Sequence, residues 1–275
     1  MAATEEDPHP WSLSGHAPLE ALREQGFALL APEELASLSG VATAGLQDWL
    51  PQWDRLPPDE YLRDGGRYRF RRHGCYILEV ADGVLTRTPH RPHWQSTDYN
   101  ALHGGIDRWF APLEEELATD PRWTALLRSL GAFFAEVGPV ERWYIEAHQF
   151  RIDAAGGLGR PTPEGAHRDG VDFVAVIVVN RSGVRGGETR VFQADGPLGM
   201  RFVIDKPWSA LLLDDAHVIH ETTPIQPEAQ ASPATASAAG RERSAPSDPD
   251  DPVAPPAVRD TLVLTYRRGG FQSSE

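Results

Sequence analysis

The sequence predicts a mainly β protein, an antiparallel sandwich or jelly roll with helices packed on one face. Two observations support this fold class. Segments with a helical pattern are confined to the part of the chain before residue 140. After that point, short runs with β propensity recur between Gly, Pro and Asp turns, and no helix-length pattern separates them. A run of strands that follows a run of helices is typical of this architecture.

The first part of the chain mixes helices with strands. Pro32 suits the first turn of a helix, and the alternation in RYRFRRHGCYILEV favours extended structure. A break at Asp120-Pro121 divides the last helical region. In order, the expected elements are a helix at 18–25, a strand at 26–30, a helix at 32–50, strands over 67–80 and helices over 98–138.

The chain after residue 140 is predicted to consist almost entirely of strands. Each run is six to ten residues long, contains β-branched, aromatic or aliphatic residues, and is bounded by turn residues. The expected strands lie at 144–152, 171–180, 188–193, 200–205, 209–215, 217–225 and 259–268.

A segment rich in Ala, Pro and Ser separates the last two of these strands. Residues 226–257 contain no aromatic side chain and cannot bury enough apolar surface to order themselves, so we expect a disordered insert. Loop closure costs grow slowly with length, so paired strands tolerate it. We therefore expect one domain over 1–275, with mostly helical N-terminal support at 1–140 and a jelly-roll core at 141–270.

Composition excludes several classes of protein. The formal net charge of −14 argues against binding to nucleic acid or to an anionic membrane. No run of eighteen apolar residues could span a membrane, and the acidic N-terminus has no secretory signal pattern, which together predict a cytoplasmic protein. Cys75 is the only cysteine, so a bound metal must use His, Asp or Glu.

The segment PTPEGAHRDGVDF (161–173) carries the candidate metal ligands. His167 and Asp169 are two residues apart, so on an extended strand they share a face, beside a turn at Gly170. His220 lies on a later strand. Two histidines and one carboxylate form the facial triad of non-haem Fe(II) oxygenases, which leaves more open positions than a catalytic zinc site. The same ligands also accept Mn, Co, Ni or Zn. A turn histidine beside a capping Asp is the alternative interpretation of H-x-D alone.

A candidate anion site follows on the last strand. Arg259 and Thr261 share one strand face, and a guanidinium with a neighbouring hydroxyl can bind the distal carboxylate of a dicarboxylate. Leu262 and Leu264 then point to the face on which the helices would pack. Arg267 and Arg268 are rivals for the dicarboxylate, but they stand at the far end of the strand before two glycines.

The order of these motifs resembles that of the double-stranded β-helix, a cupin-like jelly roll, of Fe(II)/2-oxoglutarate dioxygenases. HQFRI, PTPEGAHRDGVDFV, RGGET, LLLDDAHVIHETTPI and RDTLVLTYRR are similar to the bacterial 2-oxoglutarate-Fe dioxygenase family, which includes free L-amino-acid hydroxylases such as isoleucine 4-hydroxylase. The resemblance covers roughly residues 20–270 and is strongest from 144 onward. The chain departs from the family pattern in the 226–257 insert, which pushes Arg259 far from His220.

The resemblance implies a reaction and a set of roles. His167, Asp169 and His220 would hold Fe(II), and Arg259 with Thr261 would bind 2-oxoglutarate. With O2, the enzyme would hydroxylate a free L-amino acid or a similar small molecule and release succinate and CO2. The same chemistry on a peptidyl residue or a natural product is an alternative, as is a non-catalytic jelly-roll module that binds a metal. No catalytic residue beyond the iron centre is predicted.

Other polar residues carry weaker expectations. Arg151 and Glu164 are the best placed to bind the carboxylate and the ammonium of an amino acid, with a surface salt bridge as the alternative for each. The arginines of RYRFRR are expected on a charged strand face, and part of a pocket entrance is the minority interpretation. We expect His148 to be a satisfied structural histidine or to support the metal site. His217 is expected on the face opposite His220, and Asp215 in a turn or behind a metal ligand.

Overall fold

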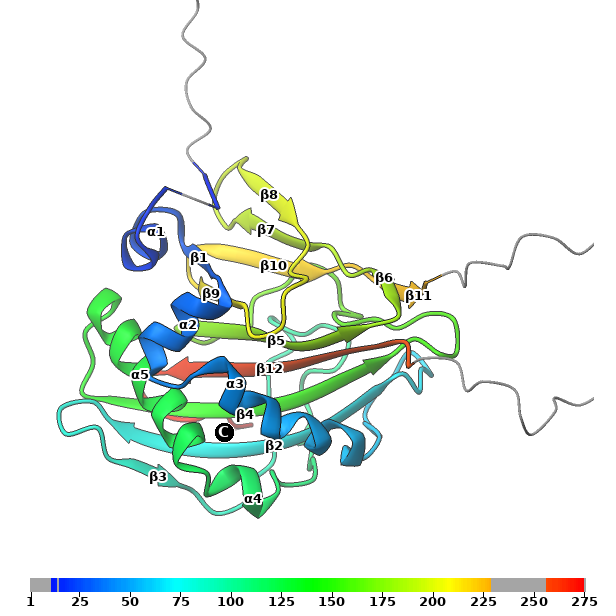
Figure 1. Ribbon diagram of the computed structural model, residues 1–275, viewed down its shortest axis with the longest axis horizontal. Helices are drawn as coiled ribbons and strands as arrows, with labels where there is room; N and C mark the ends of the chain where they lie inside the picture. The colour runs from blue at the N-terminus through cyan, green and yellow to red at the C-terminus, as the bar shows by residue number, and fades with distance from the viewer. Residues whose placement is uncertain (1–10, 14, 229–255, 275) are drawn as a thin grey trace, which may run out of the picture.

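The structure is a computed structural model that describes residues 11–13, 15–228 and 256–274. Its largest element is a seven-stranded antiparallel sheet, with strand order β1-β9-β5-β12-β4-β2-β3. Figure 1 shows its central strands lying side by side across the molecule. The strands are β1 (Phe27–Leu30), β2 (Arg69–Glu79), β3 (Leu85–Arg87), β4 (Arg142–Asp153), β5 (Phe173–Ser182), β9 (Ala210–Asp214) and β12 (Val258–Arg267).

Smaller antiparallel sheets complete the β structure. One has the order β10-β7-β8 and the other pairs β11 with β6. Together with the large sheet they form a mainly β jelly roll, as the sequence predicts. The strands are β6 (Val184–Gly186), β7 (Thr189–Gln193), β8 (Gly199–Phe202), β10 (Val218–Thr222) and β11 (Ile225–Pro227).

The helices lie on one face of the large sheet, in front of it in Figure 1. They are α1 (Pro18–Gln25), α2 (Pro32–Ser39), α3 (Thr43–Leu46), the 3-10 helix η1 (Gln47–Arg55), α4 (Glu115–Ala118) and α5 (Pro121–Val137). α5 is the longest, and it begins at Pro121 with Asp120 as its N-cap, whose side chain accepts the Arg122 N–H. None of the described helices is long and apolar enough to cross a membrane.

The period of two in the central strands separates two cores. On β5, Ala175 and Ile177 pack toward the helices, whereas Val174 and Val178 pack toward the small sheets. On β12, Leu262 and Leu264 join the helix-side core, as expected from the sequence. The side chains on the other face of β12 are therefore available to line a cavity.

Several sequence-based boundaries were wrong. The helix expected over 32–50 is divided at Gly40, which ends α2 in the left-handed region (φ 68°). The expected helical region over 98–138 contains helix only from Glu115 onward. The insert predicted at 226–257 lies mostly outside the described residues; its first residues, Gln226 and Pro227, belong to β11.

Gly131 on α5 offers a test of the helix-side core. Alanine normally stabilises a helix by about 1 kcal/mol relative to glycine. Here a Cβ would lie 2.3 Å from Leu78 Cδ2 and 3.3 Å from Trp143. Gly131→Ala should therefore lower the free energy of unfolding by about 1–3 kcal/mol, measured by urea denaturation. Gly45→Ala is the control, since its Cβ would come no closer than 3.2 Å to another atom, the Arg122 Nη1 at the protein surface. Equal stability of the two variants would contradict the packing.

Candidate active site

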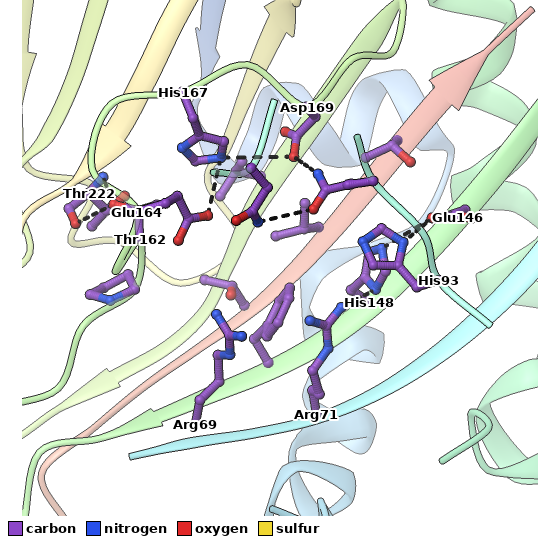
Figure 2. A pocket seen from close by; sticks show the side chains of 18 of the residues that line it. Arg69, Arg71, His93, Glu146, His148, Thr162, Glu164, His167, Asp169 and Thr222 are labelled. Atoms are coloured by element: carbon purple, nitrogen blue, oxygen red, sulfur yellow. Dashed lines mark hydrogen bonds and ion pairs between the residues drawn. The ribbon is translucent and has the colours of Figure 1, made fainter. Parts of the chain in front are cut away.

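A single cavity with about 920 Å³ of empty space, partly open to solvent, contains both predicted sites. Its floor is the face of β2, β4 and β12 turned away from the helices, and its opposite wall is the 161–169 loop with β10. Figure 2 shows His167 and Asp169 on one side and Arg69 and Arg71 on the other. The predicted metal and dicarboxylate residues therefore share one space.

Backbone pairing brings the two histidines together. His167 and His220 form an isolated bridge in which each N–H donates to the other's carbonyl oxygen over 3.0 Å. Their ring centroids are 4.7 Å apart. His167 Nε2 lies 3.8 Å from Asp169 Oδ1, and His220 Nε2 lies 3.8 Å from Asp169 Oδ2. These distances are too long for hydrogen bonds. The two imidazole nitrogens and the carboxylate therefore lie close together without bonding one another, as metal ligands would.

Hydrogen bonds set the orientation of the donors. His167 Nδ1 lies 2.9 Å from the Gly165 carbonyl oxygen and donates to it, which leaves the Nε2 lone pair free. Burial, with His167 as a second cause, holds the pKa of His220 well below its usual value, so this ring is neutral. The Gln95 amide donates to Asp169 Oδ1 over 3.2 Å.

The turn that carries Asp169 is held by a second carboxylate. Asp215 accepts the backbone N–H groups of Asp169, Gly170 and Val171 over 2.8–3.1 Å. Gly170 has φ +75°, and the Tyr99 ring occupies the place where a Cβ would lie. Asp215 is fully buried. It therefore positions the Asp169 backbone, and the structure does not place it behind a histidine.

The residues present fit a divalent metal ion. His167, Asp169 and His220 offer two imidazole nitrogens and one carboxylate oxygen within 4.8 Å of one another. Nitrogen and oxygen donors of this kind on one side of an ion suit Fe(II). His217, by contrast, is exposed and pairs with Asp214 over 2.9 Å, away from the triad.

Arg259 is a buried cation with unused donors. Its side chain is 4% exposed, and it forms no ion pair or hydrogen bond with any side chain in the described residues. Burial, and then the nearby Arg181, lowers its pKa to about 10. Thr261 lines the cavity beside it. The rivals lie elsewhere, since Arg267 donates to the Gly270 carbonyl and Arg268 pairs with Asp172.

Comparisons with known proteins decide the family. A model of the 2OG-Fe dioxygenase family matches residues 50–237, more than half of the sequence. The chain belongs to this family. A crystal structure of a bsmA homolog from Methylobium petroleophilum PM1 is 53% identical over 94% of both chains, with a TM-score of 0.81. None of the curated proteins matches the sequence.

Two more distant structures share the fold. IDO from Bacillus thuringiensis is 17% identical over 93% of this chain and 98% of its own, with a TM-score of 0.66. The Fe(II)/α-ketoglutarate-dependent dioxygenase TqaL is 16% identical over 94% and 89%, with a TM-score of 0.62. Enzymes of the 2OG-Fe dioxygenase family use Fe(II), 2-oxoglutarate and O2, and these are the cofactors of this dioxygenase.

Of the two residues predicted to bind substrate, one lies in the cavity and the other does not. Glu164 lines the cavity of the dioxygenase, with Oε1 3.7 Å from His167 Nε2. Arg151 does not line it. Its guanidinium pairs with Asp260 over 2.7 Å and with Asp54 over 2.7 Å, on the helix side of the sheet. Of the two interpretations offered for Arg151, the geometry matches the salt bridge and gives no support to substrate contact.

The dioxygenase cavity also contains residues that sequence reasoning missed or placed there only as an alternative. Arg69 and Arg71 alternate along β2 and point into the cavity, so the geometry matches the pocket interpretation of the RYRFRR arginines and not the charged strand face that was expected first. Arg108, His93 and Glu146 also line the cavity. Arg108 and His93 come from a segment without regular structure, joined by an isolated bridge, and no sequence pattern indicates their position.

The Arg151 ion pair yields a prediction. Asp260 is 1% exposed, so Arg151→Ala would leave its carboxylate buried without its main partner. The variant should lose about 3–5 kcal/mol in free energy of unfolding. Asp54→Ala should lose little, because the Asp54 side chain is 72% exposed. Denaturant unfolding measures both. A stable Arg151→Ala variant with weakened substrate binding would instead restore the substrate role.

Proposed function

We propose that this dioxygenase hydroxylates a free L-amino acid or a similar small molecule and releases succinate and CO2. One observation supports the proposal most strongly: a His-Asp-His triad and a buried arginine, which has no carboxylate partner in the described part of the chain, line one cavity. The triad suits the metal, and the arginine suits a dicarboxylate co-substrate. A space shared by both leaves room for a third molecule beside them.

His167, Asp169 and His220 would hold Fe(II), which supplies the oxidising chemistry with O2 when it is bound. The chain's part is to fix the ligands. The Gly165 carbonyl holds the His167 tautomer, and Gln95 holds one oxygen of Asp169. Because these three residues would be the ion's only protein ligands, co-substrate and O2 would have the remaining positions.

Arg259 and Thr261 would bind the distal carboxylate of 2-oxoglutarate. The guanidinium is held rigidly by burial and lacks a carboxylate partner among the described residues, so binding a carboxylate removes an existing electrostatic penalty. A planar guanidinium also binds a carboxylate through two parallel hydrogen bonds. The Thr261 hydroxyl on the same strand face adds a third donor.

Glu164 is our candidate for the substrate ammonium. Its Oε2 atom is buried and has no hydrogen-bond partner among the described residues. Such a carboxylate attracts a cation into the cavity, beside the triad where the reacting carbon must lie. The cavity is lined mostly by buried side chains, which favours a small molecule over a peptidyl residue. A natural-product substrate of similar size is the alternative.

Removal of the Arg259 guanidinium tests the co-substrate site. Arg259→Ala should weaken 2-oxoglutarate binding by about 100-fold while Fe(II) still binds, because a buried charge pair would be lost. The measurement is an anaerobic titration that follows the visible charge-transfer band of the Fe(II)–2-oxoglutarate complex. Arg267→Ala is the control. Weaker 2-oxoglutarate binding in Arg267→Ala, with unchanged binding in Arg259→Ala, would show that Arg267 and not Arg259 binds the co-substrate.

Substrate profiling tests the substrate class. With Fe(II), 2-oxoglutarate and O2, at least one proteinogenic L-amino acid should gain the mass of one oxygen. Glu164→Gln should raise the KM for that amino acid, but not for the 2-hydroxy acid with the same side chain, because only the amine needs the carboxylate. If no amino acid is hydroxylated while a peptide or natural product is, the proposed substrate class is wrong.

A further inference from the structure

The end of the cavity away from the 161–169 loop holds more positive charge than its carboxylates balance. Arg69 pairs with Asp59 over 2.7 Å. Arg71 lies 3.8 Å from the same Asp59 oxygen, beyond hydrogen-bond distance. Arg108 forms no ion pair among the described residues, and its one side-chain hydrogen bond goes to Gln95. Asp59 therefore makes a hydrogen-bonded ion pair with Arg69 and only a longer contact with Arg71, so three arginines at this end face two carboxylates, Asp59 and the nearby Glu146.

Arg71 is held in place as a rigid donor. It is 4% exposed, and its guanidinium carbon lies 3.7 Å from the centre of the Phe110 ring and 4.2 Å from that of Phe150. Two aromatic faces fix the plane of a guanidinium but satisfy none of its N–H groups. Its Nε is buried without a hydrogen-bond partner. Burial also lowers the pKa of Arg71 well below its usual value, as expected for a cation with too little compensating charge.

A cluster of His73, His93, Glu146 and His148 stands behind Arg71, and its donor atoms lie within 4.8 Å of one another. It could suggest a second metal site, but its hydrogen bonds argue otherwise. Arg71 Nη2 can only donate, and it lies 2.6 Å from His148 Nδ1. A neutral His148 must then carry its proton on Nε2, the atom that faces Glu146, and that nitrogen cannot bind a metal.

The cluster is better explained as a support for Arg71. His93 Nδ1 donates to Glu146 Oε2 over 2.5 Å. Burial would raise the pKa of Glu146, but His93 and His73 lower it below its usual value, so Glu146 is a carboxylate. This anion favours the His148 tautomer that accepts from Arg71. The guanidinium is thus oriented from behind by His148, with its remaining donors directed at the cavity (Figure 2).

We propose that Arg71, assisted by Arg108, binds the carboxylate of the substrate, while Arg259 binds that of 2-oxoglutarate. This inference rests on the proposed function and names the feature by which the substrate is recognised. Arg71 stands on β2, and Arg259 stands on β12, with β4 between them in the sheet. With Glu164 as the partner for an ammonium, the cavity offers opposite charges for the two ends of an amino acid.

Direct binding, rather than turnover, tests the proposal. Enzyme loaded with Fe(II) and 2-oxoglutarate, without oxygen, is titrated calorimetrically with each proteinogenic L-amino acid and with the corresponding carboxamide. Wild type should bind at least one acid and prefer it strongly to its amide. Arg71→Gln should weaken binding of that acid by about 100-fold and remove the preference, because a buried charge-assisted pair is lost. The affinity for 2-oxoglutarate should stay unchanged.

Arg72→Gln is the matched control, because Arg72 is the next residue on β2 and pairs with Glu114 over 3.0 Å. It should bind like wild type. Arg108→Gln, expected to show a smaller loss in the same direction, keeps the test available if Arg71→Gln does not unfold cooperatively. An unchanged preference for the acid in Arg71→Gln and Arg108→Gln overturns this inference alone. Weaker 2-oxoglutarate binding in Arg71→Gln also overturns it. Failure of wild type to bind any amino acid overturns the proposed substrate class and this inference with it.

Discussion

The site depends on one buried carboxylate, Asp215, which accepts three successive backbone N–H groups from the turn at Asp169–Val171. A turn that follows a loop has no ladder to hold it, so its N–H groups need another acceptor. Because Asp215 follows β9 directly, it fixes this turn to the large sheet. The His167–His220 bridge fixes the other end of the same loop to β10. The three candidate ligands converge because both ends are held.

The second organising constraint is the two-sided character of the central strands. β12 sends Leu262 and Leu264 into the helix-side core and leaves Arg259 and Thr261 to the cavity. The helices therefore protect the sheet without entering the site. The same division places Arg69, Arg71, Glu146 and Arg259 on the cavity face of the large sheet, which the helix-side core already holds rigid. Preorganised charges of this kind bind a charged ligand with little reorganisation.

The sequence predicts those parts of the site that depend on residues close together in the chain. Face-sharing at spacing two identified His167 with Asp169 and Arg259 with Thr261, although His167 is a bridge residue in a loop and not part of a long strand. Arg151 shows the limit. It lies opposite Asp260 in the β4–β12 register, so it must share the face of Asp260 and not that of Arg259. Register between distant strands is not visible in a single sequence. For that reason the pocket was only the second interpretation offered for Arg71, whereas Arg108 was missed altogether because it lies in an irregular segment.

The central claim is that a turn held by Asp215 completes an iron site at His167, Asp169 and His220. An anaerobic Fe(II) titration of Asp215→Asn beside Asp214→Asn tests it most directly, because the Asp214 carboxylate accepts the Ala216 N–H and pairs with His217, away from the turn at Asp169–Val171. Asp215→Asn should bind Fe(II) about 10–100-fold more weakly than wild type, while Asp214→Asn binds it equally well. Wild-type affinity in Asp215→Asn, with cooperative unfolding retained, would contradict the account.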